Sequence, residues 1–182
     1  FSDLSTSSAA GSSIQTVYAV KDTGADLGVL HDTPANLVAQ TLNSTVTPRT
    51  IANPLSVNWA AQNGWYVDLP TGERVNVDPR LQLGSLVLVA NAPKDDYCSV
   101  GGSSYLYTFD YASGGAVLGQ TGKFVGWPVG NSLATGLTLI QLSTKNLTAI
   151  INLADASISS LQPPSLAGGG GVLRRVGWRE IR

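Results

Sequence analysis

His31 is the one histidine in this chain of 182 residues, so it is the first candidate for acid–base chemistry. A hydrolytic triad needs a histidine held between a nucleophile and a carboxylate. His31 lies in the stretch Val-Leu-His-Asp-Thr-Pro, which is typical of a surface loop, and the spacing reveals no partner for it. We therefore predict that His31 is a solvated loop residue, that the chain holds no catalytic residue, and that the protein is not an enzyme.

Cys98 is the only cysteine, so it cannot form a disulfide within the chain. It follows Asp95 and Asp96, whose negative charges oppose formation of the reactive thiolate. A structural or externally paired cysteine is therefore favoured over a nucleophile. With one cysteine and one histidine, the ligands for a zinc site do not exist.

Asp22, Asp26 and Asp32 are the candidates for a metal site. Calcium takes about six to eight oxygen ligands, usually from a dense alternating run of carboxylates. Here apolar residues stand where further ligands would be needed. We predict that these aspartates instead shape turns by accepting backbone N–H groups, and we expect no metal or other cofactor in this chain.

Asp68, Glu73 and Asp78 could form paired carboxylates for acid–base work. They flank a segment with the turn-forming residues Pro70 and Gly72, so we predict solvated turn residues instead. The arginines at positions 174, 175, 179 and 182 form a modest basic patch, for which pairing with carboxylates is the favoured role.

The composition predicts a folded chain, because 43% of the residues are hydrophobic and 13% are charged. The formal net charge is -1, so no basic field is available to bind nucleic acid. No apolar run reaches the roughly 18 residues that span a bilayer. The start at Phe1 without Met suggests a processed product or a fragment, and the abundance of Ser, Thr, Asn and Gly suits an exported bacterial surface protein.

Short apolar or alternating segments, separated by turn signals, predict an all-β fold of antiparallel strands. No segment shows a convincing helical pattern of about ten residues or more. We expect residues 1–13 to form an exposed polar leader or loop, and residues 163–171 a Pro/Gly-rich loop. The expected strands are residues 14–22, 37–42, 49–51, 65–69, 73–77, 85–93, 103–110, 123–129, 136–144, 146–154 and 172–181.

Two of these strands end in the same way, with an aspartate followed by a short glycine turn: residues 16–26 and 105–115. The Asp110 carboxylate can accept the following backbone N–H groups, and a glycine can take the left-handed position. Strand 85–93 is nearly all apolar, so it should be buried on both faces. Recurring strands of this kind fit the blades of a propeller, although spacing alone does not separate a propeller from a sandwich.

Several longer strings resemble the C-terminal β-propeller region of the PilY1/PilC family of type IV pilus proteins. The resemblance covers nearly the whole chain in order, with Tyr105 where the family more often has Trp. The matching residues are Gly64, Trp65, Tyr66, Asp68, Pro70, Gly72, Glu73, Arg74, Asp78, Pro79, Cys98, Gly101, Gly102, Asp110, Trp178, Arg179 and Glu180.

The resemblance implies that residues 1–182 are the last blades of a propeller with about seven blades. It implies a pilus biogenesis factor and tip adhesin that promotes pilus extension, surface attachment and twitching motility. The implied location is the pilus tip, outer membrane or surface of a bacterium. The implied partners are minor pilins or the pilus tip complex, a host or abiotic surface, and the rest of the same propeller. Calcium is implied only for the upstream part of the family's propeller.

The residues expected to bind partners lie in two loops, 22–36 and 94–103, because both are long and carry polar groups between strands. The candidates are Asp22, Asp26, His31, Asp95, Asp96 and Cys98. Two alternatives stay open. One is an enzymatic propeller of the quinoprotein type, which needs a cofactor-stacking Trp, metal ligands and a catalytic Asp. The other is a structural subunit of an extracellular filament.

Overall fold

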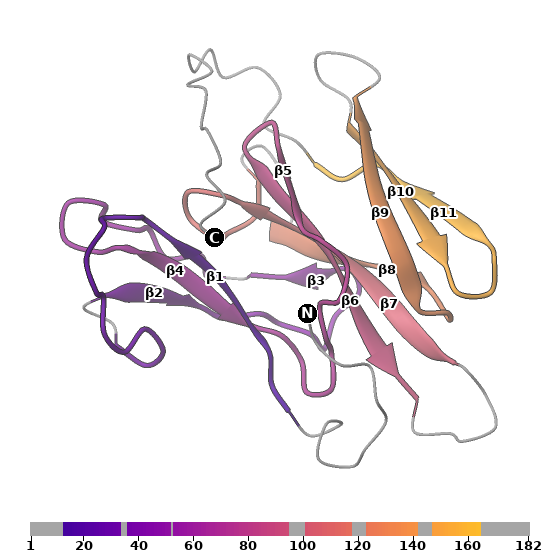
Figure 1. The fold of residues 1–182 in the computed structure, drawn as a ribbon, viewed down its shortest axis with the longest axis horizontal. Coiled ribbons are helices and arrows are strands. Elements are labelled where there is room, and N and C mark those ends of the chain that lie inside the picture. Colours follow the sequence, from indigo (N-terminus) through magenta and orange to yellow (C-terminus); the bar gives the residue numbers. More distant parts are fainter. Residues whose placement is uncertain are drawn as a thin grey trace.

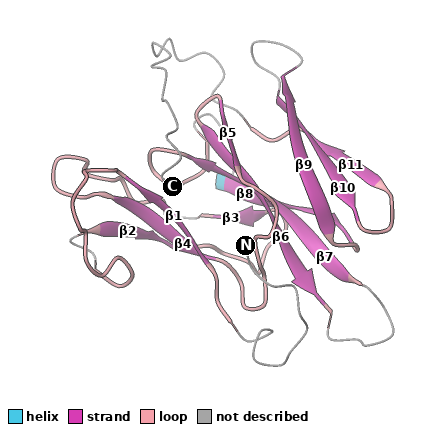
Figure 2. Ribbon diagram, in the orientation of Figure 1, coloured by secondary structure: helices cyan, strands magenta, loops and turns pink. Residues whose placement is uncertain are grey.

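The computed structural model of the chain describes residues 13–33, 36–51, 53–94, 101–117, 123–141 and 147–164. These residues form eleven β-strands in three sheets (Figures 1 and 2). No α-helix occurs among these residues, and the short helical piece drawn in Figure 2 is a 3₁₀ turn at Lys123. The prediction of an all-β chain is confirmed. Within the described residues, no helix is long and apolar enough to cross a membrane. The predicted leader, apart from Ser13, and the predicted strand 172–181 lie outside these ranges.

The three sheets follow one another along the chain, except that β3 of the middle sheet precedes β4 of the first. The first sheet has the strand order β1 (Thr16–Val20), β4 (Gly64–Asp68), β2 (Leu37–Gln40). The middle sheet has the order β3 (Arg49–Thr50), β8 (Phe124–Gly130), β7 (Gly102–Asp110), β6 (Ser85–Pro93), β5 (Arg80–Gln82). The third sheet has the order β11 (Ile158–Leu161), β10 (Leu147–Leu153), β9 (Ala134–Gln141).

Antiparallel pairing holds for the described strand pairs except β2 and β4, which run parallel. The chain leaves the first sheet after β2, adds β3 to the middle sheet and then returns as β4. Such a crossover lets β4 run in the same direction as β2, which a tight hairpin does not allow.

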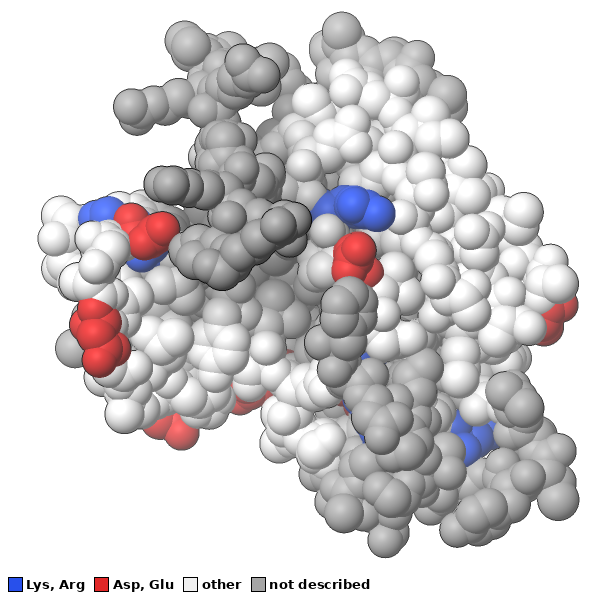
Figure 3. All heavy atoms as spheres, in the orientation of Figure 1, with Lys and Arg blue, Asp and Glu red and all other residues white. Residues whose placement is uncertain are grey.

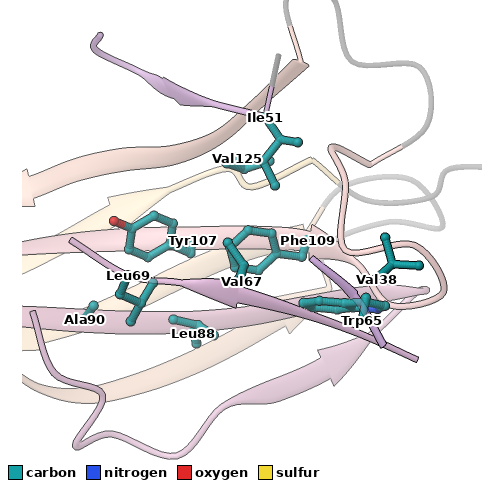
Figure 4. Close-up of a cluster of buried hydrophobic side chains, with 10 residues drawn as sticks. All are labelled: Val38, Ile51, Trp65, Val67, Leu69, Leu88, Ala90, Tyr107, Phe109 and Val125. Atoms are coloured by element: carbon teal, nitrogen blue, oxygen red, sulfur yellow. The ribbon is translucent and has the colours of Figure 1, made fainter. Parts of the chain in front are cut away.

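A hydrophobic core fills the space between the first and middle sheets (Figure 4). Trp65 and Val67 of β4 face Tyr107 and Phe109 of β7, and the rings of Trp65 and Phe109 lie 5.8 Å apart. All four side chains have no exposed surface. Each large side chain buried in this way stabilises the fold by about 1.5–3 kcal/mol.

A second core lies on the opposite face of the middle sheet. Val87 and Val89 of β6 and Leu106 of β7 pack there against Ala149 and Ile151 of β10. Because the alternate β6 residues Leu88 and Ala90 belong to the first core, β6 is buried on both faces. This confirms the prediction for strand 85–93.

The turn after β7 follows the predicted logic. Asp110 Oδ1 accepts the backbone N–H groups of Ala112 and Ser113 at 3.0 and 2.9 Å. Gly114 then takes a φ of 73°, which suits glycine. A Cβ at this position would lie 2.4 Å from the Trp65 ring, so the turn closes directly over the core.

Glu73 is buried, and the prediction of a solvated turn residue is wrong for it. Its Oε1 lies 2.6 Å from Nη1 of Arg49 on β3, and its Oε2 accepts the Tyr107 hydroxyl at 2.7 Å. Arg49 also donates to the Tyr107 hydroxyl and stacks 3.5 Å from the Tyr105 ring centroid. Burial, together with the nearby Glu73 carboxylate, raises the pKa of Tyr107. The phenol therefore stays protonated and donates to Glu73.

Residues 73–77 do not form the predicted strand. The segment makes one isolated bridge, between Arg74 and Asn91, while β5 takes the place beside β6. Residues 65–69 and 73–77 also do not pair with each other as a hairpin, because β4 pairs with β1 and β2. The buried ion pair between Glu73 and Arg49 explains why this segment is not a strand. A charge inside the fold is stable only in close contact with its partner, and this contact sets the path of the chain.

Asn91 joins the middle and third sheets through buried hydrogen bonds. Its Oδ1 accepts the Ser104 hydroxyl at 2.6 Å and the Ala134 backbone N–H at 2.8 Å. Its Nδ2 donates to Asn76 Oδ1 at 2.6 Å and to the Ala134 carbonyl at 2.8 Å. Since every polar atom of the amide has a partner, the group fixes the start of β9 against β6 at little desolvation cost.

We expect Glu73→Ala to lower the free energy of unfolding by about 3–5 kcal/mol, because it leaves the Arg49 charge buried without its partner. Urea unfolding followed by tryptophan fluorescence measures this loss. Asp78→Ala removes an exposed carboxylate five positions along the chain and serves as the matched control, with little change expected. Equal unfolding midpoints for the two variants would contradict the assignment. The pair Arg49→Met with Glu73→Leu should recover much of the loss.

Candidate functional site

The outer face of the first sheet carries a line of polar and aromatic residues. Along β1 and β4, alternate residues such as Val17 and Trp65 face the core. The intervening residues face away from it, and the strand register pairs Thr16 with Asp68 and Tyr18 with Tyr66. The sheet therefore brings the two tyrosine rings and the Asp68 carboxylate onto one surface.

Gly64 permits the close pairing of β1 and β4 that holds these residues in place. It has a φ of 151°, and a Cβ there would lie 1.9 Å from the Ala19 carbonyl oxygen. A side chain at this position would push the two strands apart. The glycine thus positions Tyr18 beside Tyr66 without contacting either ring.

The segment 21–33 lies over this face and is shaped by its own aspartates. Asp22 and Asp26 accept the backbone N–H groups of Gly24 and Gly28 at 2.9 and 2.8 Å, as the turn prediction requires. Asn36 donates to the carbonyl of Leu27 at 3.0 Å and fixes the segment to the start of β2. The structure does not gather Asp22, Asp26 and Asp32 into one ligand set, and no described group of three His, Cys, Asp or Glu residues could hold a metal ion.

His31 is a partly exposed loop residue, as predicted, and it also lies between two carboxylates that the sequence did not reveal as its partners. Its Nδ1 is 2.9 Å from Asp32 Oδ2, and its Nε2 is 3.2 Å from Asp68 Oδ1. The imidazole ring is stacked against Tyr66, with centroids 4.6 Å apart, and meets Tyr18 edge-on at 6.5 Å. We call Tyr18, His31, Asp32, Tyr66 and Asp68 the His31 cluster.

Hydrogen bonding sets the charge state of the cluster. The contacts of His31 with Asp32 and then Asp68 raise the pKa of the imidazole. Burial beneath the imidazole is the main cause of the raised pKa of Tyr66. Thr16 donates its hydroxyl to Asp68 Oδ1 at 2.5 Å, which fixes the carboxylate. The cluster can hold a positive charge between carboxylates beside aromatic rings.

The cluster is open to solvent even though it is tied to the sheet. The exposed fractions are 38% for the His31 side chain, 83% for Asp32 and 42% for Asp68. Tyr18 is 41% exposed, whereas Tyr66 is 6% exposed. A partner can therefore reach the carboxylates and one ring, while Tyr66 supports the others from below.

The other predicted site residues fall into three groups: those outside the described residues, those in the core, and those in the His31 cluster. Asp95, Asp96, Cys98, Trp178, Arg179 and Glu180 lie outside the described residues. Within the described part of the family motif, Trp65 and Glu73 serve the core and the buried ion pair. Tyr66 and Asp68 instead point outward into the His31 cluster.

Sequence reasoning missed Thr16 and Tyr18 as members of the site, and it missed Arg49 as the partner of Glu73. The alternation within residues 16–20 was the available signal, because it places Thr16 and Tyr18 on the face opposite Val17. For Arg49 no such local signal exists, because its partner lies on another element.

A shallow groove of about 340 Å³ lies beside the loop that carries the motif residue Asp78. It runs between this loop and the beginning of β9, and its lining includes Asn76, Arg80, Thr135 and Thr138. Its walls are mostly polar, and Asp78 is exposed. It contains no histidine or cysteine among its lining residues.

We expect the imidazole of His31 to titrate above about 6.5, the ordinary value for histidine. Because this folded-state pKa is raised, the contribution of His31 to stability is complete below the unfolded pKa and is lost as the pH rises through the raised pKa. The chain has one histidine, so a single imidazole signal in a proton NMR titration reports the value. Asp68→Asn should lower it, and a wild-type value at or below the ordinary one would contradict the geometry.

Comparison with known proteins relates this chain to a protein of named function. No family model and no solved structure matches the chain. The type IV pilus biogenesis factor PilY1 homolog of Xylella fastidiosa (strain Temecula1) is 33% identical over 115 residues, which is 59% of this chain. The chain covers 8% of that relative, and its placement at the C-terminal end of the family stays a prediction. The resemblance to the PilY1 family drawn from the sequence is confirmed by this similarity.

Proposed function

We propose that this chain is part of a β-propeller that acts in type IV pilus biogenesis at the bacterial cell surface, by binding and without catalysis. The observation that carries the proposal is the 33% identity to a protein named as a type IV pilus biogenesis factor. The proposal extends to pilus extension, surface attachment and twitching motility. The partners it names are minor pilins or the pilus tip complex, a host or abiotic surface, and the remainder of the propeller.

The arrangement of the sheets supports the propeller part of the proposal. Strands β5, β6, β7 and β8 are neighbours in chain order and pair antiparallel, which is the layout of a four-stranded blade. Strands β9, β10 and β11 repeat this up-and-down order in the next sheet. The sheets pack face to face through the two apolar cores, as successive blades do (Figure 1).

The surface of the first sheet supports a binding role. Rigid strands present the His31 cluster, and the segment 21–33 is anchored above them by His31 and Asn36. Binding sites are commonly built in this way, from loop residues on a rigid scaffold. The loop 94–103 is the second proposed binding segment, although most of it lies outside the described residues.

A quinoprotein-type enzyme is the less favoured alternative. Such a protein needs a tryptophan whose face can stack on the cofactor. Trp65 has no exposed surface, and its Nε1 donates to the Tyr111 carbonyl at 2.9 Å, so this ring serves the core. A coloured preparation with a quinone absorbance would favour the alternative, and ordered filaments of the purified chain would favour a structural subunit.

The proposal is tested in the bacterium that encodes the chain, with the complete gene product. Deleting the region for residues 13–164 should abolish surface pili and twitching, measured by shearing and immunoblotting the major pilin and by the twitching zone. Restoring the region with Asp78→Ala should rescue both, whereas Glu73→Ala, which is expected to destabilise the fold, should not. Normal piliation in the deletion strain, with the remaining protein at its usual level, would overturn the proposal.

A further inference from the structure

We propose that the His31 cluster is a binding site for a basic side chain, an arginine or a lysine, presented by a polypeptide partner. This inference rests on the proposed binding function of the chain and names the chemistry of the ligand. It depends on three features of the outer face of the first sheet: two accessible carboxylates, an exposed aromatic ring and an acidic surrounding surface.

The carboxylates of Asp32 and Asp68 already hold a basic group between them. The His31 ring reaches Asp32 through Nδ1 and Asp68 through Nε2, at 2.9 and 3.2 Å. A protonated imidazole donates to both carboxylates. It therefore occupies the place that a basic side chain of a partner would take. Thr16 and His31 both use Oδ1 of Asp68. Because the Asp68 side chain is 42% exposed, a further donor can reach this carboxylate from solvent.

Tyr18 supplies an aromatic face beside the carboxylates. Tyr18 is 41% exposed. Its ring centroid lies 5.9 Å from that of Tyr66, so the two rings are in contact on the outer face of the sheet. A guanidinium or ammonium group is attracted to the face of such a ring, and a neighbouring carboxylate strengthens the contact. The exposed side chain of Val20, on the same face of β1, can cover the aliphatic stem of the incoming residue.

The surface around the cluster is acidic. Residues 21–33 carry Asp22, Asp26 and Asp32 against Lys21, and β4 adds Asp68. These segments therefore carry four carboxylates and one ammonium group, whereas the formal charge of the whole chain is -1. Figure 3 shows red atoms at several places over the part of the molecule where β1, β2 and β4 lie, with blue atoms beside one of them. A basic partner is drawn to this side of the chain, and an acidic one is repelled.

An inorganic cation fits the cluster less well than an organic one. Calcium needs about six to eight oxygen ligands around one point. Here the two carboxylates lie on opposite sides of the imidazole, and the described residues contain no convergent set of three ligands. A guanidinium is planar and carries several donors, so it can donate to one of these carboxylates and still lie over the Tyr18 ring.

Protonation of His31 should oppose binding, because the imidazolium occupies the carboxylates that the partner needs. The groups that face His31 are Asp32 on its own segment, Asp68 and Tyr66 on β4, and Tyr18 on β1. A neutral imidazole can donate to only one of the two carboxylates. Binding of a basic side chain should therefore strengthen as the pH rises through the pKa of His31, over the range of about pH 5–8 in which histidine changes charge.

The test uses the full 182-residue chain, labelled for NMR, and the blocked peptide acetyl-Ala-Arg-Ala-amide as the probe. We expect saturable shift changes at Tyr18, His31 and Asp68, and none with acetyl-Ala-Gln-Ala-amide. Tyr18→Leu should weaken binding about two- to fivefold, the worth of an exposed cation–π contact. Tyr111→Leu is the matched control, because Tyr111 is 52% exposed and lies outside the cluster. His31→Gln should bind at every pH and lose the pH dependence.

Three outcomes would overturn the inference: no saturable change with the arginine peptide, equal changes with the glutamine peptide, or tighter binding of calcium chloride at the same residues. Asp68→Asn provides a second check, since it keeps the shape of the side chain and should weaken arginine binding. The result is separable from the pilus proposal. A failed titration with piliation lost in the deletion strain removes this inference alone, and a positive titration with normal piliation removes the proposed pilus function.

Discussion

Arg49 of β3 and Glu73, in the segment after β4, place opposite charges together inside the fold, where their side chains are 9% and 4% exposed. Removing each ion from water costs several kcal/mol, so the pair is stable only with close contact and further hydrogen bonds. Tyr107 supplies such a bond, and the Tyr105 ring covers the guanidinium. Because Glu73 follows β4 by five residues, this contact fixes where the first sheet ends against the middle one.

The placement of the His31 cluster is a consequence of that arrangement. The inner face of β4 is committed to the core through Trp65 and Val67, so the alternate residues Tyr66 and Asp68 must face outward. There they meet β1 on one side and the segment 21–33 above. The same short strand therefore packs into the core on one face and presents the His31 cluster on the other.

Much of the fold could be predicted from local patterns, and the long-range contacts could not. Strand 85–93 and the Asp110 turn were predictable, because run length and turn chemistry are local properties. Residues 73–77 looked like a strand because Val75 and Val77 alternate with polar residues, yet a distant arginine draws Glu73 inward. His31 and Asp68 are separated by 37 positions, so topology alone reveals their contact. The alternation of Tyr18 and Tyr66 was visible, but which face met the core was not.

The parallel pairing of β2 with β4 has a consequence for the order of folding. β4 is the central strand of its sheet, and its partners β1 and β2 both precede it, with Thr16 and Asp68 separated by 52 positions. Closing such long loops costs the chain conformational entropy before the contacts between the strands form and stabilise it. The hairpins β5–β6 and β9–β10 have no such requirement, since their strands are neighbours in the chain. We therefore expect the face that carries the His31 cluster to assemble late, on a scaffold that later parts of the chain can begin to form first.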